Sequence, residues 1–207
     1  MSACYRRLNL PKNPLKNIDA VLHRVKNAPS PFHMFNVDPF DTLTDDVLGI
    51  FDNLNLRPRA ATVFHLPVPR TESQSLMHTD ILRVGDQWKF ITCGVNWELN
   101  DIAAQLSWWD TDRPELYPTD SKFFWLDPHG IHYSSRFKQG IDASTDRRID
   151  SVNTLDHPLL VRTNIPHNVY LPDQDFQDTV RCSISIRFEN DFPTWEDAVD
   201  CFRPVTL

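Results

Sequence analysis

Residues 180–188 read Val-Arg-Cys-Ser-Ile-Ser-Ile-Arg-Phe, and apolar and polar side chains alternate along them without a break. Successive side chains of a β-strand point to opposite faces of the sheet, so this period of two predicts a strand with one face in a core. The apolar face holds Cys182, Ile184 and Ile186, and the N-terminal helices are the candidate for packing against it. The polar face, with Arg181 and Ser183, either meets solvent or lines the inside of a barrel.

The same period of two runs through most of the chain from about residue 60. It predicts further strands at 60–66, 75–84, 88–97, 103–109, 122–126 and 158–162. Val84-Gly85-Asp86-Gln87 is a hairpin turn between two of them. The segment 110–157 is rich in Asp, Arg, Ser and Thr and contains one clear strand, which is typical of a functional loop or an insertion.

Residues 1–58 are predicted to be mainly helical. Asn13 is a candidate N-cap with Pro14 in the first helical position, and the apolar stripe behind it is Leu15, Ile18, Leu22 and Val25. Thr44 begins a second helix whose apolar side carries Val47, Leu48, Phe51 and Leu54. Near the other end, Thr194 caps a short helix, with Asp197 in the capping-box position.

Helices followed by many short strands predict a mainly β fold, with an antiparallel sheet pair or barrel and helices packed on one side. A chain of 207 residues without a repeat or a flexible linker is predicted to form a single domain. Within it, we expect a barrel core over 60–190 and a C-terminal extension over 191–207.

Composition restricts the class of protein and of partner. The hydrophobic content of 41% indicates a folded protein, and the net charge of −7 argues against non-specific binding to nucleic acid or to anionic membranes. The sequence contains no run of about eighteen apolar residues, the length that crossing a membrane would need. Four widely spaced cysteines fit reduced thiols better than a disulfide framework or a zinc knuckle, so we expect a cytoplasmic protein. These cysteines are Cys4, Cys93, Cys182 and Cys201. The sequence does not indicate an oligomeric state.

Two histidines and one aspartate are candidate metal ligands. His78 and Asp80 are two residues apart in a predicted strand, so both side chains leave the same face. His167 follows Pro166 at the end of an apolar strand, where the rigid proline aims the next side chain. Two imidazoles and a carboxylate suit non-heme Fe(II), because they leave coordination positions open. The competing interpretations are a surface His–Asp pair and a turn histidine.

Arg181 and Ser183 follow His167 along the chain. A guanidinium binds a carboxylate through two parallel hydrogen bonds, and a neighbouring hydroxyl adds a third. Arg181 is 14 positions after His167, which allows one loop and an antiparallel return beside the metal ligands.

The ordered set His78-Thr79-Asp80, His167 and Arg181-Cys182-Ser183 resembles the iron(II)- and 2-oxoglutarate-dependent oxygenases, over about residues 60–190. The stretches 93–100 and 158–169 resemble the aspartyl/asparaginyl β-hydroxylase-like branch of that family. The resemblance implies a double-stranded β-helix, a jelly-roll or cupin-like barrel with the metal at one mouth.

By the same resemblance, His78, Asp80 and His167 bind Fe(II), while Arg181 and Ser183 bind the distal carboxylate of 2-oxoglutarate. Asn96 is expected to face this cavity. The implied reaction consumes O2, releases succinate and CO2 and hydroxylates a C–H bond of a small-molecule or peptidyl substrate. Two alternatives remain: another metal-dependent cupin-type enzyme, for which the chain lacks the usual His-x-His pair, and a non-catalytic barrel binding module.

Overall fold

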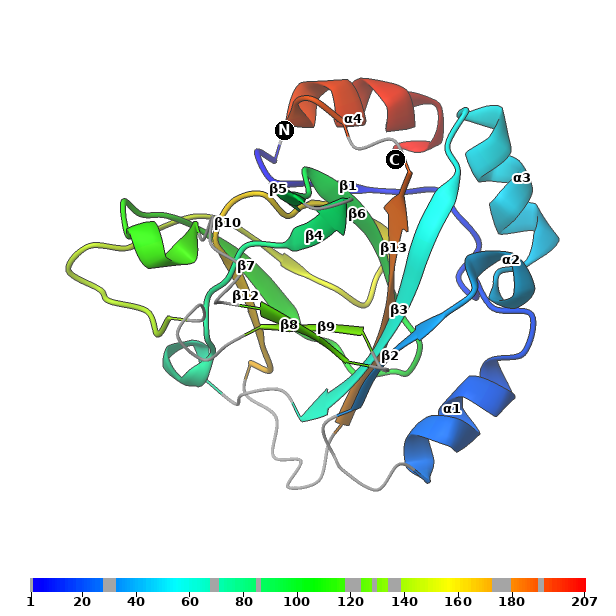
Figure 1. Ribbon diagram of the computed structural model, residues 1–207, viewed down its shortest axis with the longest axis horizontal. Helices are drawn as coiled ribbons and strands as arrows, with labels where there is room; N and C mark the ends of the chain where they lie inside the picture. Colours follow the sequence, from blue (N-terminus) through cyan, green and yellow to red (C-terminus); the bar gives the residue numbers. More distant parts are fainter. Residues whose placement is uncertain are drawn as a thin grey trace.

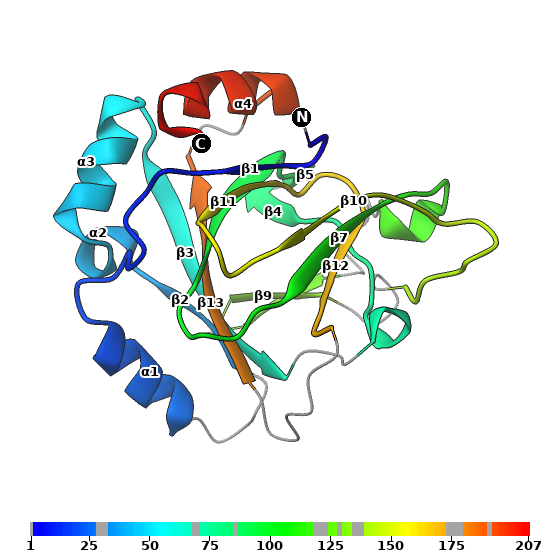
Figure 2. The same cartoon turned by 180° about the vertical axis from the view of Figure 1, so that it is seen from behind.

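The computed structural model describes residues 2–27, 33–67, 71–84, 87–117, 124–127, 130–133, 139–172, 180–189 and 192–207. The described part is mainly β, as the sequence predicts, with antiparallel pairing throughout its sheets. Two sheets face each other, and Figures 1 and 2 show the labelled α-helices on the outer side of the larger one.

The major sheet has six strands in the order β1-β11-β6-β13-β3-β2. Each neighbouring pair is antiparallel, and β13, the alternating strand, lies between β6 and β3. Its bounds match the predicted strand. The strands of this sheet are β1 (Tyr5–Arg7), β2 (His33–Val37), β3 (Pro58–Pro67), β6 (Cys93–Glu98), β11 (Leu159–Arg162) and β13 (Val180–Phe188).

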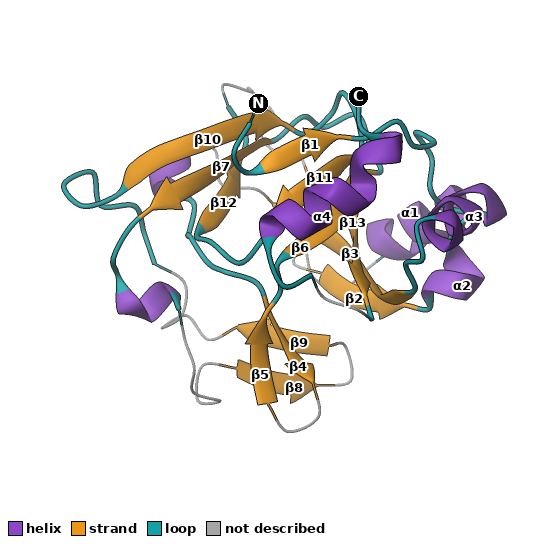
Figure 3. Cartoon of the chain, turned by 90° about the horizontal axis from the view of Figure 1, so that it is seen from above, coloured by secondary structure: helices purple, strands orange, loops and turns teal. Residues whose placement is uncertain are grey.

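The minor sheet has three strands in the order β10-β7-β12, with bounds Arg147–Asn153, Gln105–Asp110 and His167–Tyr170. Two hairpins lie on the same side of the two sheets in Figure 3. One joins β4 (Ile81–Val84) to β5 (Gln87–Phe90), with Val84 opposite Gln87 as the hairpin prediction requires. The other joins β8 (Phe124–Asp127) to β9 (Gly130–Tyr133).

The helices are α1 (Ile18–Lys26), α2 (Pro39–Thr42), α3 (Asp45–Asn53) and α4 (Trp195–Phe202), with short 3-10 helices at Glu72–Gln74, Pro114–Leu116 and Arg203–Val205. Thr44 caps α3 by accepting a hydrogen bond from the Val47 N–H. Thr194 caps α4 in a capping box with Asp197. Both caps are those that the sequence predicts.

The two faces of β13 have different surroundings. Ile184 and Ile186 are fully buried on the outer face, in one hydrophobic cluster with Val47 and Phe51 of α3. A smaller cluster fills part of the space between the two sheets, where Trp108 of β7 packs with Leu159 and Val161 of β11, among others. The polar face of β13 therefore looks into the space between the sheets.

Several predicted elements differ from the observed ones. Helix α1 begins at Ile18 with Asn17 as its cap, because Asn13 instead accepts a hydrogen bond from Leu15 and forms a turn. The predicted strand 75–84 is formed only from Ile81 onward, and the preceding residues make isolated bridges. The predicted strand 88–97 is interrupted into β5 and β6.

Five strands of the described part were not predicted. Strands β1 and β2 lie in the region interpreted as mainly helical, β9 and β10 lie in the segment 110–157, and β12 follows the predicted strand 158–162. Strand β10 has no clear alternation, since its sequence is Arg-Arg-Ile-Asp-Ser-Val-Asn and its pairing with β7 shifts between Arg148 and Asp150. Strands β1, β2, β10 and β12 each pair with a strand that is remote in the sequence, which local periodicity does not record.

Candidate metal centre

His78 and His167 lie opposite each other in an isolated antiparallel bridge. The backbone N–H of His78 donates to the carbonyl of His167 at 3.0 Å, and the reverse bond measures 2.9 Å. Side chains opposite each other in such a pair leave the same face of the sheet. The two imidazole centroids are consequently 4.6 Å apart, although the residues are far apart in the sequence.

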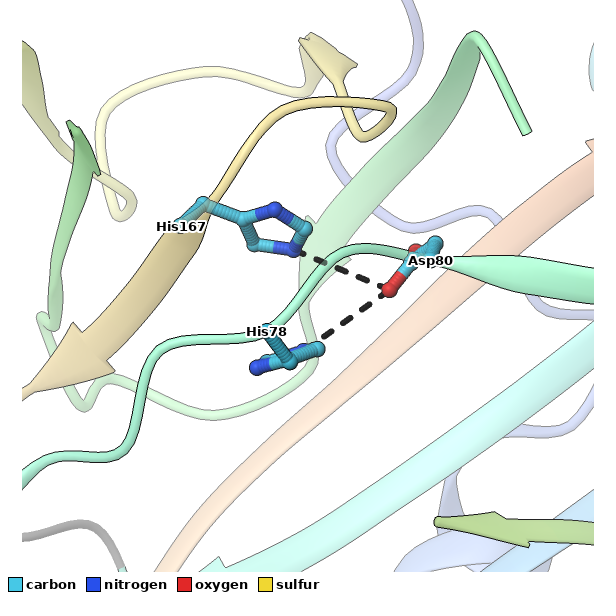
Figure 4. Close-up of side chains that lie close together, drawn as sticks. All are labelled: His78, Asp80 and His167. Carbon is cyan, nitrogen blue, oxygen red and sulfur yellow. Dashed lines mark ion pairs between the residues drawn. The ribbon is translucent and has the colours of Figure 1, made fainter. Parts of the chain in front are cut away.

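Asp80 joins the two histidines from the same segment as His78. Its backbone N–H donates to the Thr163 carbonyl at 2.8 Å, and its own carbonyl accepts from the Ile91 N–H at 3.0 Å. These bonds fix the backbone on both sides of the carboxylate. Asp80 Oδ1 lies 3.7 Å from Nε2 of each histidine, and Figure 4 shows the three side chains pointing toward one another.

The donor set fits a divalent transition metal. One ligand atom from each of the three residues lies within 4.8 Å of the other two. Metal bonds of about 2.0–2.2 Å at right angles place neighbouring ligand atoms about 3 Å apart, so an ion needs only a modest contraction of the cluster. The side chains of His78, Asp80 and His167 are 22%, 14% and 8% exposed, so the site is partly open. The structure brings the three predicted ligands together, and their role as ligands remains a prediction.

The hydrogen bonds of His167 direct one ring nitrogen toward the cluster. Its Nδ1 is 2.9 Å from the Ile165 carbonyl oxygen, and a carbonyl can only accept, so Nδ1–H donates there. Nε2 then faces Asp80, and it carries the lone pair in the neutral ring that metal binding requires. A backbone carbonyl in this role is the usual way in which a metal-binding histidine is oriented.

The Asp80 carboxyl is held in its ionised form. Burial alone would raise its pKa, but the positive charge of Arg187, followed by His167 and His78, outweighs burial, and the pKa lies below its ordinary value. The carboxylate is therefore available as an anionic ligand.

Arg181 and Ser183 of β13 face the space between the sheets. Arg181 Nε lies 2.9 Å from both carboxylate oxygens of Glu98, and these two side chains are 11% and 3% exposed. Ser183 is buried. Arg181 and Arg187 are six positions apart on β13, which is roughly 20 Å of backbone, so Arg181 lies near the opposite end of the strand from the guanidinium that contacts Asp80. The binding of a co-substrate by Arg181 and Ser183 remains a prediction.

Asn96 also lies on the inner side, directly opposite Ser185 in the β6–β13 pair. Its Oδ1 accepts a hydrogen bond from the Ser185 hydroxyl. This hydrogen bond joins two neighbouring strands, and a role of Asn96 beside a co-substrate remains a prediction.

Sequence analysis did not single out Arg187 or Glu98. The Arg187 guanidinium contacts Asp80 Oδ2 through Nη2, and Glu98 forms the ion pair with Arg181. The alternation of β13 already placed Arg187 on the face of Arg181 and Ser183, so parity was a usable signal for it. Glu98 gave no such signal, because its partner depends on the pairing of β6 with β13.

The chain matches no family model and no curated protein. Among solved structures, it is similar to the non-heme alpha ketoglutarate dependent carbocyclase SnoK from nogalamycin biosynthesis, with a TM-score of 0.47 and 11% identity over 89% of this chain and 78% of that one. It is also similar to AviO1 from Streptomyces viridochromogenes Tue57, with a TM-score of 0.45 and 11% identity over 91% and 90% of the two chains. At these values the site geometry carries the functional argument by itself.

Proposed function

We propose that this protein is an iron(II)- and 2-oxoglutarate-dependent dioxygenase. The observation that carries the proposal is the convergence of His78, Asp80 and His167 on one point from two separate segments of the chain. Two imidazoles and one carboxylate on one side of an ion, with the opposite side open, is the ligand set of non-heme Fe(II) oxygenases.

In this proposal the three residues hold Fe(II) through His78 Nε2, His167 Nε2 and Asp80 Oδ1. The bound iron supplies the activation of O2 that no side chain provides. The protein contributes ligand geometry, since the His78–His167 bridge and the two backbone bonds of Asp80 set the ligand positions in advance.

The co-substrate 2-oxoglutarate carries a distal carboxylate, for which Arg181 and Ser183 are the proposed partners, with Asn96 nearby. The contacts of Arg181 with Glu98 use Nε and Nη2, so Nη1 lies outside that pair. A guanidinium can bind anions along more than one edge. Glu98 then orients Arg181, and the proposal requires the co-substrate to extend along β13 from the metal toward Nη1 of Arg181.

The fold fits this proposal if the two sheets are the two halves of a double-stranded β-helix. The cluster would then lie at the mouth between them, since His167 begins β12 of the minor sheet and Asp80 contacts Arg187 of the major sheet. The resemblance of 93–100 and 158–169 to the aspartyl/asparaginyl β-hydroxylase-like branch would make the substrate an amino acid or a peptide.

The test is succinate release by protein loaded anaerobically with Fe(II) and then given 2-oxoglutarate and air. We expect slow release without any further substrate, because oxygenases of this type turn over partly uncoupled. His78→Ala and Asp80→Ala should abolish it, because two ligands hold the ion poorly. His23→Ala, an exposed histidine on α1, is the matched control and should retain the rate.

Arg181→Ala should raise the 2-oxoglutarate concentration needed for half-maximal release, because loss of a buried ion-pair partner costs on the order of 2–5 kcal/mol. Wild-type protein that binds Fe(II) and releases no succinate would contradict the proposal, and so would full activity of His78→Ala.

A further inference from the structure

The two oxygens of the Asp80 carboxylate have different partners. Oδ1 faces Nε2 of His78 and His167, at 3.7 Å from each. Oδ2 accepts a hydrogen bond from Nη2 of Arg187, a residue of β13 in the major sheet. The carboxylate is therefore oriented by a side chain that is outside the candidate ligand set.

We propose that Arg187 is a positioning residue that makes Asp80 a one-oxygen ligand and so keeps an additional coordination position on the metal open. This inference rests on the proposed function and adds a residue to its site. With Oδ2 bound to the guanidinium, only Oδ1 is available to an ion between the histidines. Without Arg187, the carboxylate is free to rotate and to bind through both oxygens.

Polar side chains of the major sheet hold the guanidinium of Arg187 in place. Nη1 donates to the Ser185 hydroxyl, which in turn donates to Asn96 Oδ1 on the neighbouring strand. A chain of hydrogen bonds thus runs from Asn96 through Ser185 and Arg187 to Asp80. Groups that orient a metal ligand in this way are as much a part of a metal site as the ligands.

Gly94 provides the space for this arrangement. A Cβ built on Gly94 would overlap Nη1 of Arg187, and the next nearest atoms are also in that guanidinium. The overlapping atoms are the far end of a flexible side chain, so Gly94→Ala should displace the guanidinium and leave the backbone intact. Gly94→Ala therefore moves Arg187 away from Asp80, while the charged side chains and the candidate ligands stay the same.

Charge and geometry make opposite contributions and have to be separated. The guanidinium repels a divalent cation, so a neutral replacement of Arg187 would favour metal binding while it removed the positioning. Arg187→Lys keeps the charge and loses the planar donor pair that spans Ser185 and Asp80. Gly94→Ala keeps the arginine and moves its guanidinium away from Asp80, which also lessens the repulsion of the cation, so for this variant the water count and not the affinity isolates the positioning.

The experiment measures Co(II) affinity and the number of waters on bound Mn(II), by titration and by water-proton relaxation, with no 2-oxoglutarate present. We expect Arg187→Lys and Gly94→Ala to bind Co(II) about 10–100-fold more weakly, as for other groups that orient a metal ligand. We also expect one water fewer on Mn(II) in both variants, because Asp80 then binds through two oxygens. Gly49→Ala is the matched control, since a Cβ there meets no atom within 4 Å, and it should behave as wild type.

The water count is the decisive readout, because general destabilisation lowers affinity and does not convert Asp80 to a two-oxygen ligand. If both variants keep the wild-type affinity and water count, the positioning role is wrong, and the proposed function is unaffected. If wild-type protein binds neither Co(II) nor Mn(II), the proposed function fails first. If Arg187→Lys does not fold, Gly94→Ala decides the question alone.

Discussion

Individual residues of this protein are set by the backbone around them. His78 and His167 face each other because each donates its N–H to the other's carbonyl, and Asp80 follows at the next position on the same face. The acidity of single side chains follows their surroundings in the same way. Asp80 is ionised beside Arg187, whereas burial outweighs the nearby arginines at the thiols of Cys4 and Cys182 and raises their pKa.

The buried thiols predict a loss of stability in alkali. Burial raises the pKa of Cys4 from 9.0 to about 12 and that of Cys182 from 9.0 to about 11. The pKa of each thiol is higher in the folded than in the unfolded protein. The contribution of the protonated thiols to the free energy of unfolding is therefore fully present below about pH 9 and is lost as the pH rises toward 11–12. Urea unfolding at pH 8 and pH 10.5 should show that the free energy of unfolding falls less between these two pH values in Cys182→Ser than in wild type. Equal decreases in the two proteins would contradict the assignment.

At the scale of elements, β13 makes different contacts on its two faces. The outer face packs against α3. On the inner face, two polar contacts join β13 to β6, namely Arg181 with Glu98 and Ser185 with Asn96. The helices are ended by ordinary local chemistry, as the Thr44 and Thr194 caps show. The strands without regular alternation, β1 and β10, owe their place to pairing with β11 and β7.

The ion pair between β6 and β13 predicts a large effect of a single change. Glu98→Ala leaves the guanidinium of Arg181 buried without a counter-charge, which costs about 3–5 kcal/mol of unfolding free energy. Chemical denaturation would measure this loss. As a comparison, Glu189→Ala removes the exposed partner of Arg57 and should cost no more than about 1 kcal/mol. A cost for Glu98→Ala as small as that of Glu189→Ala would show that Arg181 finds another partner.

Across the whole molecule, the candidate metal centre links parts that are otherwise separate in the fold. His167 belongs to the minor sheet, Asp80 contacts the major sheet through Arg187, and His78 lies in the segment that leads into β4. No helix in the described part of the chain is long and apolar enough to cross a membrane.

A metal bound at this junction should stabilise the entire domain. At a free metal concentration of 100 times the dissociation constant, the gain is about 2.7 kcal/mol. For a chain of this length, each kcal/mol corresponds to a rise in Tm of about 2–4 °C. Differential scanning fluorimetry with Co(II) should show this rise in wild type and none in His167→Ala. An equal rise in both would place the metal elsewhere.

The sequence by itself determined the local features of this protein. The strict alternation of 180–188 specified β13 and its two faces, and the threonine caps specified where α3 and α4 begin. The order of His78, Asp80 and His167 with their spacing also selected the three side chains that converge. The strand and the helix caps depend on residues a few positions apart, whose geometry the backbone fixes directly. The three candidate ligands were selected by residue type and order along the chain, although His167 is remote from the other two.

The tertiary structure alone decided which remote groups meet. Arg181 and Arg187 share one strand face and are equivalent by periodicity, yet pairing of β13 with β6 gives Arg181 to Glu98, while the space above Gly94 lets Arg187 reach Asp80. Strand β10 is likewise specified by its partner β7 and not by its own pattern. Such contacts depend on strand order and register, which arise from burial summed over the whole chain and have no signature within any single segment.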